Sequence, residues 1–199
     1  MFKSDNPLAG SLMSDIRARH PRVWEAVRAD ARVALLHRGE RHELTSELDA
    51  AAQVLRLIWS ADAFGGQVLY RVKAALQRRG VPVLPRLLHR LAMLSGGVTI
   101  GDPVVVEPGL HLLHGQVVID GVVQVKPGVV IGPFVTIGLR HGDIAGPVIE
   151  EDVSIGSGAR VLGQVRVGTG ASIGANAVVV DDVPAGATVV GAPARPTTD

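Results

Sequence analysis

The sequence contains no cysteine among its 199 residues. This absence excludes disulfides, thiolate zinc sites and a cysteine nucleophile, so covalent catalysis through sulfur is excluded as well. Aromatic residues are scarce, and the complete set is Phe2, Trp24, Trp59, Phe64, Tyr70 and Phe134. So few rings do not form the stacking platforms that bind single-stranded nucleic acid. We therefore expect an aliphatic core and no nucleic-acid partner.

Neither an excess of charge nor a long apolar run is present. The 20 lysine and arginine residues nearly balance the 19 aspartate and glutamate residues, so no overall field favours a nucleic-acid or membrane partner. No apolar run approaches the length that spans a bilayer, and the N-terminus lacks the pattern of a signal peptide. The length suits one or two domains. We expect a soluble, cytoplasmic protein.

Branched aliphatic residues recur every six positions between residues 98 and 195. Ten of these positions keep one register: Ile119, Val125, Ile131, Ile137, Ile149, Ile155, Val161, Val167, Ile173 and Val179. A unit this short cannot bury its apolar side alone, so successive units must stack into a solenoid. The six-residue period predicts a β-helix with three hexads per turn and a triangular cross-section.

Each hexad is interpreted as a short strand followed by a corner. β-Branched side chains suit the buried position of the strand, whereas Gly158, Gly170 and Asn176 suit corners because they tolerate left-handed backbone angles. This repeat resembles that of the hexapeptide acyltransferase superfamily. The resemblance implies a left-handed parallel β-helix, a handedness that the spacing itself does not establish.

Helical periodicity dominates the chain before the repeat. Four helices are predicted, at residues 21–39, 45–59, 68–80 and 82–94. A hydroxyl of Thr45 or Ser46 can cap the second helix, and residues 65–66 interrupt the pattern before the third. We expect Arg71 and Lys73 on the solvent side of that third helix.

The predicted fold is α+β, with an N-terminal α-helical domain followed by a left-handed parallel β-helix of hexapeptide repeats. Gly96 and Gly97 mark the expected boundary. We assign residues 1–96 to the helical domain, 97–195 to the β-helix acyltransferase domain and 196–199 to a short tail. Within the first domain, residues 1–10 show no periodicity, so we expect a loose terminus there.

One branch of the superfamily is resembled more closely. Residues 64–72 (Phe-Gly-Gly-Gln-Val-Leu-Tyr-Arg-Val), 78–80 (Arg-Arg-Gly) and 97–100 (Gly-Val-Thr-Ile) resemble the passage from helical domain to β-helix in serine acetyltransferases. The resemblance covers about residues 60–195. It implies acetyl-CoA as acyl donor, a small-molecule acceptor, and a homotrimer that the helical domain could pair into a hexamer.

The six-residue rhythm fails first near His114. Ile100, Val106 and Leu112 are in step, but the next slot, Ile119, comes seven residues later. One extra residue is therefore inserted in the corner that carries His114.

A second break occurs where Asp143 occupies an inward position. A charge is costly inside an aliphatic column, so residues 139–146 are expected to leave the coil as a loop that carries Arg140 and His141. A lone histidine on a corner is more often an ordinary exposed residue. Both breaks carry a histidine, however, and His111 is the only other histidine of the coil, so the coincidence favours function.

The family resemblance assigns roles to these residues. Residues 109–114 resemble the segment with the general base, which falls on His114, and residues 139–141 resemble the Asp-Arg-His loop of the family. The resemblance implies that Arg140 binds the acceptor carboxylate and that His141 lines the acceptor pocket. Imidazole can take a hydroxyl proton near neutral pH while the oxygen attacks a thioester.

The spacing of the two histidines bears on assembly. His114 and His141 lie 27 residues apart, which is not a whole number of three-hexad turns, so they should not stack on one face of a single prism. In the family the active sites lie between neighbouring prisms, which implies a trimer. A backbone amide near Gly138 could stabilise the oxyanion there.

Two acidic residues of the family pattern are missing. Leu113 stands where the family has the aspartate that pairs with the base, and Thr99 stands where another acid is expected. The orientation of the base and the binding of an amino group therefore need other groups. Glu107 and Asp143 are the candidates we consider for this substitution.

The donor site is implied by the resemblance alone. Gly138, Ser157 and Ala175 would line the coenzyme A groove, and Arg195 would lie near the nucleotide phosphates. Small residues are also what corners require, so Ser157 and Ala175 carry a weak signal by themselves. The sequence ends in Asp199 without the isoleucine-ended tail that inserts into cysteine synthase, so we expect no complex with that enzyme.

The sequence leaves other functions open. The same fold serves acetyltransferases that act on sugar or natural-product hydroxyls or amines, and a non-catalytic trimeric scaffold is a further alternative. A γ-type carbonic anhydrase would need three histidines on zinc, but His111, His114 and His141 lack that family's spacing. We therefore expect no metal.

Overall fold

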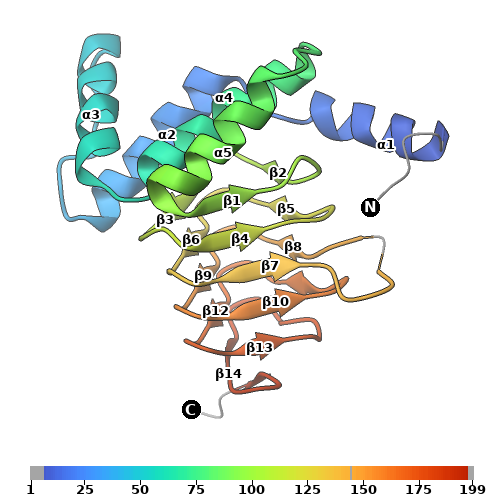
Figure 1. Cartoon of the computed structure of the whole chain (residues 1–199). Coiled ribbons are helices and arrows are strands. Elements are labelled where there is room, and N and C mark those ends of the chain that lie inside the picture. The colour runs from blue at the N-terminus through green and yellow to red at the C-terminus, as the bar shows by residue number, and fades with distance from the viewer. Residues whose placement is uncertain (1–6, 144, 197–199) are drawn as a thin grey trace.

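The structure is a computed structural model that describes residues 7–143 and 145–196. Five helices precede the strands: α1 (Pro7–Ala18), α2 (Val23–His37), α3 (Glu47–Ser60), α4 (Phe64–Arg78) and α5 (Leu84–Gly96). The strands follow without a further helix in the described residues, as Figure 1 shows. The expected fold class, a helical domain followed by a left-handed parallel β-helix, is confirmed.

The described part of the coil contains fifteen short strands. They are β1 (Val98–Ile100), β2 (Val105–Val106), β3 (His111–Leu112), β4 (Val117–Ile119), β5 (Gln124–Val125), β6 (Val130–Ile131), β7 (Thr136–Gly138), β8 (Val148–Ile149), β9 (Ser154–Ile155), β10 (Arg160–Leu162), β11 (Arg166–Val167), β12 (Ser172–Ile173), β13 (Val178–Val179), β14 (Thr188–Val190) and β15 (Arg195–Pro196).

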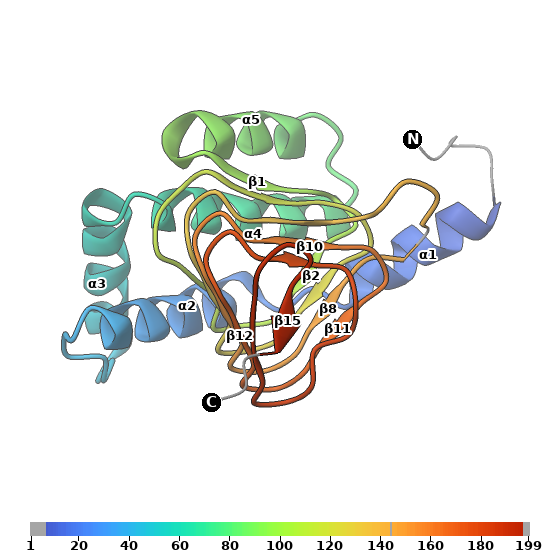
Figure 2. The same ribbon diagram turned by 90° about the horizontal axis from the view of Figure 1, so that it is seen from below.

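Three sheets run along the three sides of a triangular prism (Figure 2). Face A contains β1, β4, β7, β10 and β13, face B contains β2, β5, β8 and β11, and face C contains β3, β6, β9, β12, β14 and β15. Each strand pairs in parallel with the strand one turn away, except that β15 returns antiparallel to β14. From β1 to β13 every third strand joins the same sheet, so three hexads make one turn, as predicted.

The inside of the prism is the aliphatic column that the repeat predicted. All ten slots are at most 3% exposed, and cross-turn pairs such as Ile119 with Ile137 and Val125 with Ile149 keep them stacked. Burying one such side chain stabilises a fold by roughly 1.5–3 kcal/mol. The predicted corner residues Gly158, Gly170 and Asn176 all have positive φ angles, between 57° and 75°.

The expectation of a loose terminus over residues 1–10 is wrong where the structure describes it. The first helix, α1, begins at Pro7, so residues 7–10 are helical; residues 1–6 lie outside the described residues. Proline is tolerated in a first helical turn because its missing N–H has no partner there anyway. Among residues 12–18 of α1, Ile16 is the buried side chain.

The predicted interruption at residues 65–66 is also wrong. The break falls at Ala61, and both glycines lie in the first turn of α4. Gly66 is required for a different reason: a Cβ atom there would lie 2.8 Å from Cγ2 of Val98 on β1. The glycine thus lets α4 approach the first strand closely. The predicted hydroxyl cap of α3 is confirmed, since Ser46 accepts a hydrogen bond from the Asp49 amide.

Helix α4 lies across the open N-terminal end of the coil (Figures 1 and 2). Its polar side chains donate hydrogen bonds to carbonyls of the first turn: Gln67 to Leu110, Tyr70 to Val104, Arg71 to Val106 and Lys73 to Ile100. These bonds satisfy an end of the solenoid that would otherwise leave buried carbonyls unpaired. The expectation that Arg71 and Lys73 face solvent is therefore wrong, because both are at most 3% exposed.

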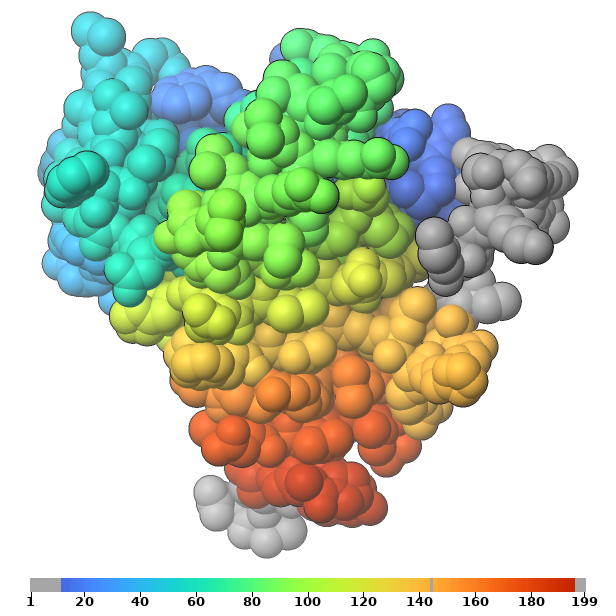
Figure 3. Space-filling model, viewed as in Figure 1, coloured from blue at the N-terminus to red at the C-terminus, as the bar shows by residue number. Residues whose placement is uncertain are grey.

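The molecule tapers from the wide helical end to the narrow C-terminal end of the coil (Figure 3). The connection between β7 and β8 protrudes from one side in this view. Among the described residues, no helix is long and apolar enough to cross a membrane.

Candidate active site

His114 lies in the corner between β3 on face C and β4 on face A. The extra residue predicted here is accommodated by an unusual corner, in which Gln116 has a φ angle of 64°. A Cβ atom on Gly115 would lie 1.7 Å from the carbonyl oxygen of Gly96, so only glycine fits beside the end of α5. The His114 side chain is 65% exposed and free to meet a ligand.

The partner of His114 is Asp62, from the connection between α3 and α4. The His114 Nδ1 atom lies 3.1 Å from the Asp62 Oδ2 atom. Neither of the two acids considered from the sequence makes this contact. Glu107 accepts a hydrogen bond from Lys126 at 2.6 Å, and Asp143 pairs with Arg140.

His111, three residues before, serves the interior instead. Its ring is 7% exposed and stacks on the His37 ring of α2, with 5.2 Å between ring centroids. Burial, together with the positive charges of His37 and Arg38, lowers the pKa of His111 to about 4. His111 therefore does not lie on an exposed corner, and it joins the helical domain to the coil.

The second break is the protruding loop between β7 and β8, as expected. Arg140 and His141 are both exposed on it, whereas Asp143 turns back and accepts a hydrogen bond from the Arg140 amide. At the base of the loop, Leu139 packs so closely on Gly121 that a Cβ atom there would lie 2.6 Å from Leu139 Cγ. The inward charge that the register implied is thus avoided by leaving the coil.

The two breaks lie at opposite edges of face A. His114 precedes β4 at the edge shared with face C, and Arg140 and His141 follow β7 at the edge shared with face B (Figure 1). The prediction that the two histidines do not stack on one side of the prism is confirmed. Within one chain, the candidate base and the candidate acceptor residues are therefore separated by the width of a sheet.

Face A itself carries a shallow hollow and exposed apolar side chains. A hollow of about 400 Å³ is lined by residues that include Met93, Gln116 and Arg160. Phe134 and Val118 border it and are 60% and 39% exposed. Exposed apolar groups gathered at a hollow are typical of a surface that binds a ligand or another chain.

Three of the four candidate donor residues are divided between these edges, and Arg195 lies at the end of the coil. Ser157 and Ala175 lie in the same stack of corners as His114, between faces C and A, and both are exposed. This stack is tightly packed, because a Cβ on Gly156 would lie 2.6 Å from the Ala175 amide nitrogen. Gly138 ends β7 at the opposite edge, and Arg195 lies on the final strand, 3.9 Å from Asp181.

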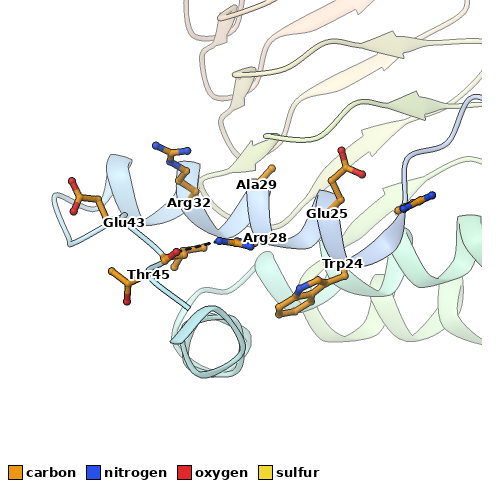
Figure 4. Close-up of a pocket in the computed structure, with 9 residues that line it drawn as sticks. Trp24, Glu25, Arg28, Ala29, Arg32, Glu43 and Thr45 are labelled. Atoms are coloured by element: carbon orange, nitrogen blue, oxygen red, sulfur yellow. Dashed lines mark hydrogen bonds between the residues drawn. The ribbon is translucent and has the colours of Figure 1, made fainter. Parts of the chain in front are cut away.

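Another hollow, of about 690 Å³, lies on the helical domain and contains none of these residues (Figure 4). It lies between α2 and the connection to α3, where Arg28 donates hydrogen bonds to Glu47 and to the Leu44 carbonyl. These contacts hold the two helices together, so we do not place the chemistry here. Among residues 7–143 and 145–196, no group of three histidine or acidic side chains could hold a metal ion.

Comparison with known proteins decides the family. A family model described as "Bacterial transferase hexapeptide (six repeats)" matches residues 146–181. The serine acetyltransferase of Helicobacter pylori (strain J99) is 38% identical over 130 residues, which cover 63% of this chain and 75% of that protein. This chain belongs to the serine acetyltransferase family. The serine acetyltransferase of Synechococcus elongatus is 34% identical over 154 residues, but this chain covers only 61% of its length.

Solved structures of serine acetyltransferases agree with this assignment. The Neisseria gonorrhoeae enzyme in complex with serine matches with a TM-score of 0.75 and 25% identity, over 96% of this chain and 78% of that one. A serine acetyltransferase in complex with CoA matches with a TM-score of 0.73 and 25% identity, over 96% and 79%. The resemblance to serine acetyltransferases stated from the sequence is confirmed.

One residue of the candidate site in this chain, Asp62, could not be found by sequence reasoning. Asp62 lies 52 residues before His114, and no spacing or motif links the two. The only signal is indirect: an acidic residue occupies the short break between α3 and α4, close in sequence to the segment that resembles the family.

Proposed function

We propose that this protein is an acetyl-CoA-dependent O-acetyltransferase whose acceptor is serine. Membership of the serine acetyltransferase family supports the reaction class, and the serine and CoA complexes of related structures support the two substrates. The observation that carries the proposal is the position of His114, an exposed imidazole at a register break, two residues before Gln116, which lines the hollow of face A.

His114 acts as the general base in this proposal. Its Nε2 atom takes the proton of the serine hydroxyl while the hydroxyl oxygen attacks the carbonyl carbon of the thioester. The tetrahedral intermediate then collapses, the carbon–sulfur bond breaks, and the proton passes from the imidazole to the departing sulfur. A backbone amide near Gly138 stabilises the oxyanion, because such donors are directed where negative charge develops.

The acceptor is held by Arg140 and His141 of a neighbouring protomer. These residues lie across face A from His114, so a complete site forms only where the loop edge of one prism meets the His114 edge of another. A closed ring of three prisms brings the two edges together at every contact. The exposed Phe134 and Val118 on face A are the side chains that this homotrimer would bury.

Trimers could pair further into a hexamer through the helical domain. Helix α3 exposes Leu48, Leu55 and Trp59, which are 84%, 68% and 93% exposed. The assembly is measured directly by light scattering, in which a chain of 20.8 kDa gives three or six times that mass.

Coenzyme A lies along the groove between two prisms, in contact with Ser157 and Ala175 of one and Gly138 of the other. The two exposed small residues leave the corner stack below His114 open to an extended ligand. The Arg195 guanidinium, 66% exposed near the end of the coil, is placed for the nucleotide phosphates.

The residues at two positions of family acids favour a second class of acceptor. Leu113 and Thr99 occupy the positions of two family acids, and Leu113 is 46% exposed and apolar beside the base. An acceptor without an amino group at that point, such as another hydroxyl-bearing carboxylate or a natural-product hydroxyl, fits this change.

The test is the release of free CoA thiol from acetyl-CoA in the presence and absence of L-serine. Serine-dependent release that His114→Ala abolishes, with the oligomer intact, is the expected result. Release that depends on another hydroxyl compound but not on serine would move the acceptor to the second class. Release by His114→Ala at the wild-type rate would remove the assignment of the base.

A further inference from the structure

The chain supplies an acidic partner for His114 from the helical domain. Asp62 Oδ2 lies 3.1 Å from His114 Nδ1, a hydrogen-bond distance. A carboxylate only accepts, so the contact places the proton of a neutral imidazole on Nδ1 and leaves Nε2 bare. The side chains of Asp62 and His114 are 74% and 65% exposed, so the pair faces the place where substrates arrive.

Backbone contacts fix Asp62 in this position. A Cβ atom on Gly96 would lie 2.6 Å from the Asp62 carbonyl oxygen, and a Cβ on Gly115 would lie 1.7 Å from the Gly96 carbonyl oxygen. The end of α5 therefore packs between two other segments. It contacts the connection between α3 and α4 on one side and the corner after His114 on the other. This packing holds the backbones of Asp62 and of the His114 corner close together, within reach of their side chains.

Other acids are engaged elsewhere. Glu107 pairs with Lys126, Asp143 pairs with Arg140, and Asp102 pairs with the buried Lys73. Leu113, where the family has the acid next to its base, offers no acceptor.

We propose that Asp62 is the positioning residue of the base. It comes from the helical domain and takes the place of the family's aspartate, whose position is occupied here by Leu113. This proposal rests on the proposed role of His114 as base. Asp62 holds the imidazole ring and its tautomer, so that Nε2 points to the acceptor hydroxyl and is free to take its proton. As Nε2 becomes protonated, the nearby carboxylate stabilises the imidazolium. The helical domain thus takes part in the chemistry.

The kinetic test uses Asp62→Asn, Asp62→Glu and a charge-matched control, Asp15→Asn, at an exposed position on α1. For Asp62→Asn we expect kcat to fall about 10- to 100-fold, within the range of general-base effects, while KM for both substrates changes little. Asp62→Glu, which keeps a carboxylate on a longer chain, should recover most of the rate. Asp15→Asn should match the wild type. Wild-type kcat in Asp62→Asn would overturn the proposal.

A second measurement does not depend on turnover. The ¹⁵N resonances of the His114 ring, assigned by their loss in His114→Gln, report which nitrogen carries the proton. The proposal expects protonated Nδ1 and bare Nε2 in the wild type and in Asp62→Glu. It expects loss of that preference in Asp62→Ala, which has no side-chain acceptor, whereas the asparagine of Asp62→Asn keeps an acceptor oxygen. An unchanged tautomer in Asp62→Ala would overturn it. If the wild-type protein releases no CoA with any acceptor, the proposed function fails, while the tautomer measurement still decides the role of Asp62.

Discussion

The Asp30 carboxylate and the Arg71 guanidinium form a buried ion pair with two hydrogen bonds of 2.9 Å. The Asp30 Oδ1 atom also accepts hydrogen bonds from the backbone amides of Gly109 and Leu110, at 2.8 and 3.0 Å. Both charged side chains are at most 2% exposed. One carboxylate therefore ties α2, α4 and the segment that leads to His114 into a single unit.

Removal of Asp30 should strongly destabilise the protein. Asp30→Ala leaves the buried Arg71 guanidinium without its counter-charge and two backbone amides without a partner, and breaking such a pair costs about 3–5 kcal/mol of unfolding free energy. Urea unfolding measures the loss. The control is Glu47→Gln, which removes the surface pair with Arg28 and should cost no more than about 1 kcal/mol. Equal losses in the two variants would contradict the importance of the buried pair.

Two adjacent glycines of α4 should respond in opposite directions to alanine. Gly65→Ala meets no atom closer than 3.7 Å and should stabilise the helix by about 0.5–1 kcal/mol. In Gly66→Ala the new methyl lies 2.8 Å from Val98 Cγ2 and should destabilise by about 1–3 kcal/mol, because α4 is pushed from the first strand. Thermal unfolding distinguishes the two. A stabilised Gly66→Ala protein would mean that α4 does not lie this close to the coil.

Stability should fall when the pH drops from about 6.5 to about 4. Burial lowers the pKa of His20 and of His111 to about 4, with the positive charges of Arg71 near His20 and of His37 near His111 as further causes. The unfolded chain binds these protons near pH 6.5, whereas the folded protein does not, so acid favours unfolding by on the order of 2 kcal/mol per ring.

Thermal unfolding at several pH values measures this dependence. The stability of the wild type should not be reduced by these two rings above pH 6.5. His111→Gln should make the loss of stability below pH 6.5 less steep, because the glutamine does not titrate. His42→Gln, in the connection between α2 and α3, should decline as the wild type does. A decline of wild-type steepness in His111→Gln would assign the effect to other groups.

The coil could be predicted from the sequence because its fold is determined by local features of the sequence. A six-residue period sets which side chains point inward, and corners such as Asn176 carry their own backbone preference. The two exceptions to the period also marked His114 and the loop of Arg140, because a solenoid tolerates irregularity only where the chain leaves the stack.

The contacts of the helical domain could not be predicted in this way. Helical spacing suggested that Arg71 and Lys73 face water. In the structure these buried cations donate hydrogen bonds to backbone carbonyls at the N-terminal end of the coil. Asp62 meets His114 through packing of segments 52 residues apart, which no local pattern encodes. Helix α1 was missed for the same reason, since it packs against α4.

The central claim is that one active site is completed by two chains. His114→Ala and Arg140→Ala remove groups from opposite edges of face A, so the proposed homotrimer of either variant should have only defective sites. Arg140→Ala should chiefly weaken acceptor binding, and activity is therefore measured at low serine concentration.

The deciding measurement is the activity of trimers assembled from equal amounts of these two variants by co-expression. If sites are shared, a chain with intact His114 meets a chain with intact Arg140 at about a quarter of the contacts, and activity should return to about a quarter of the wild-type value. Activity no greater than the mean of the two separate variants would contradict the shared site and place all of the chemistry within one chain.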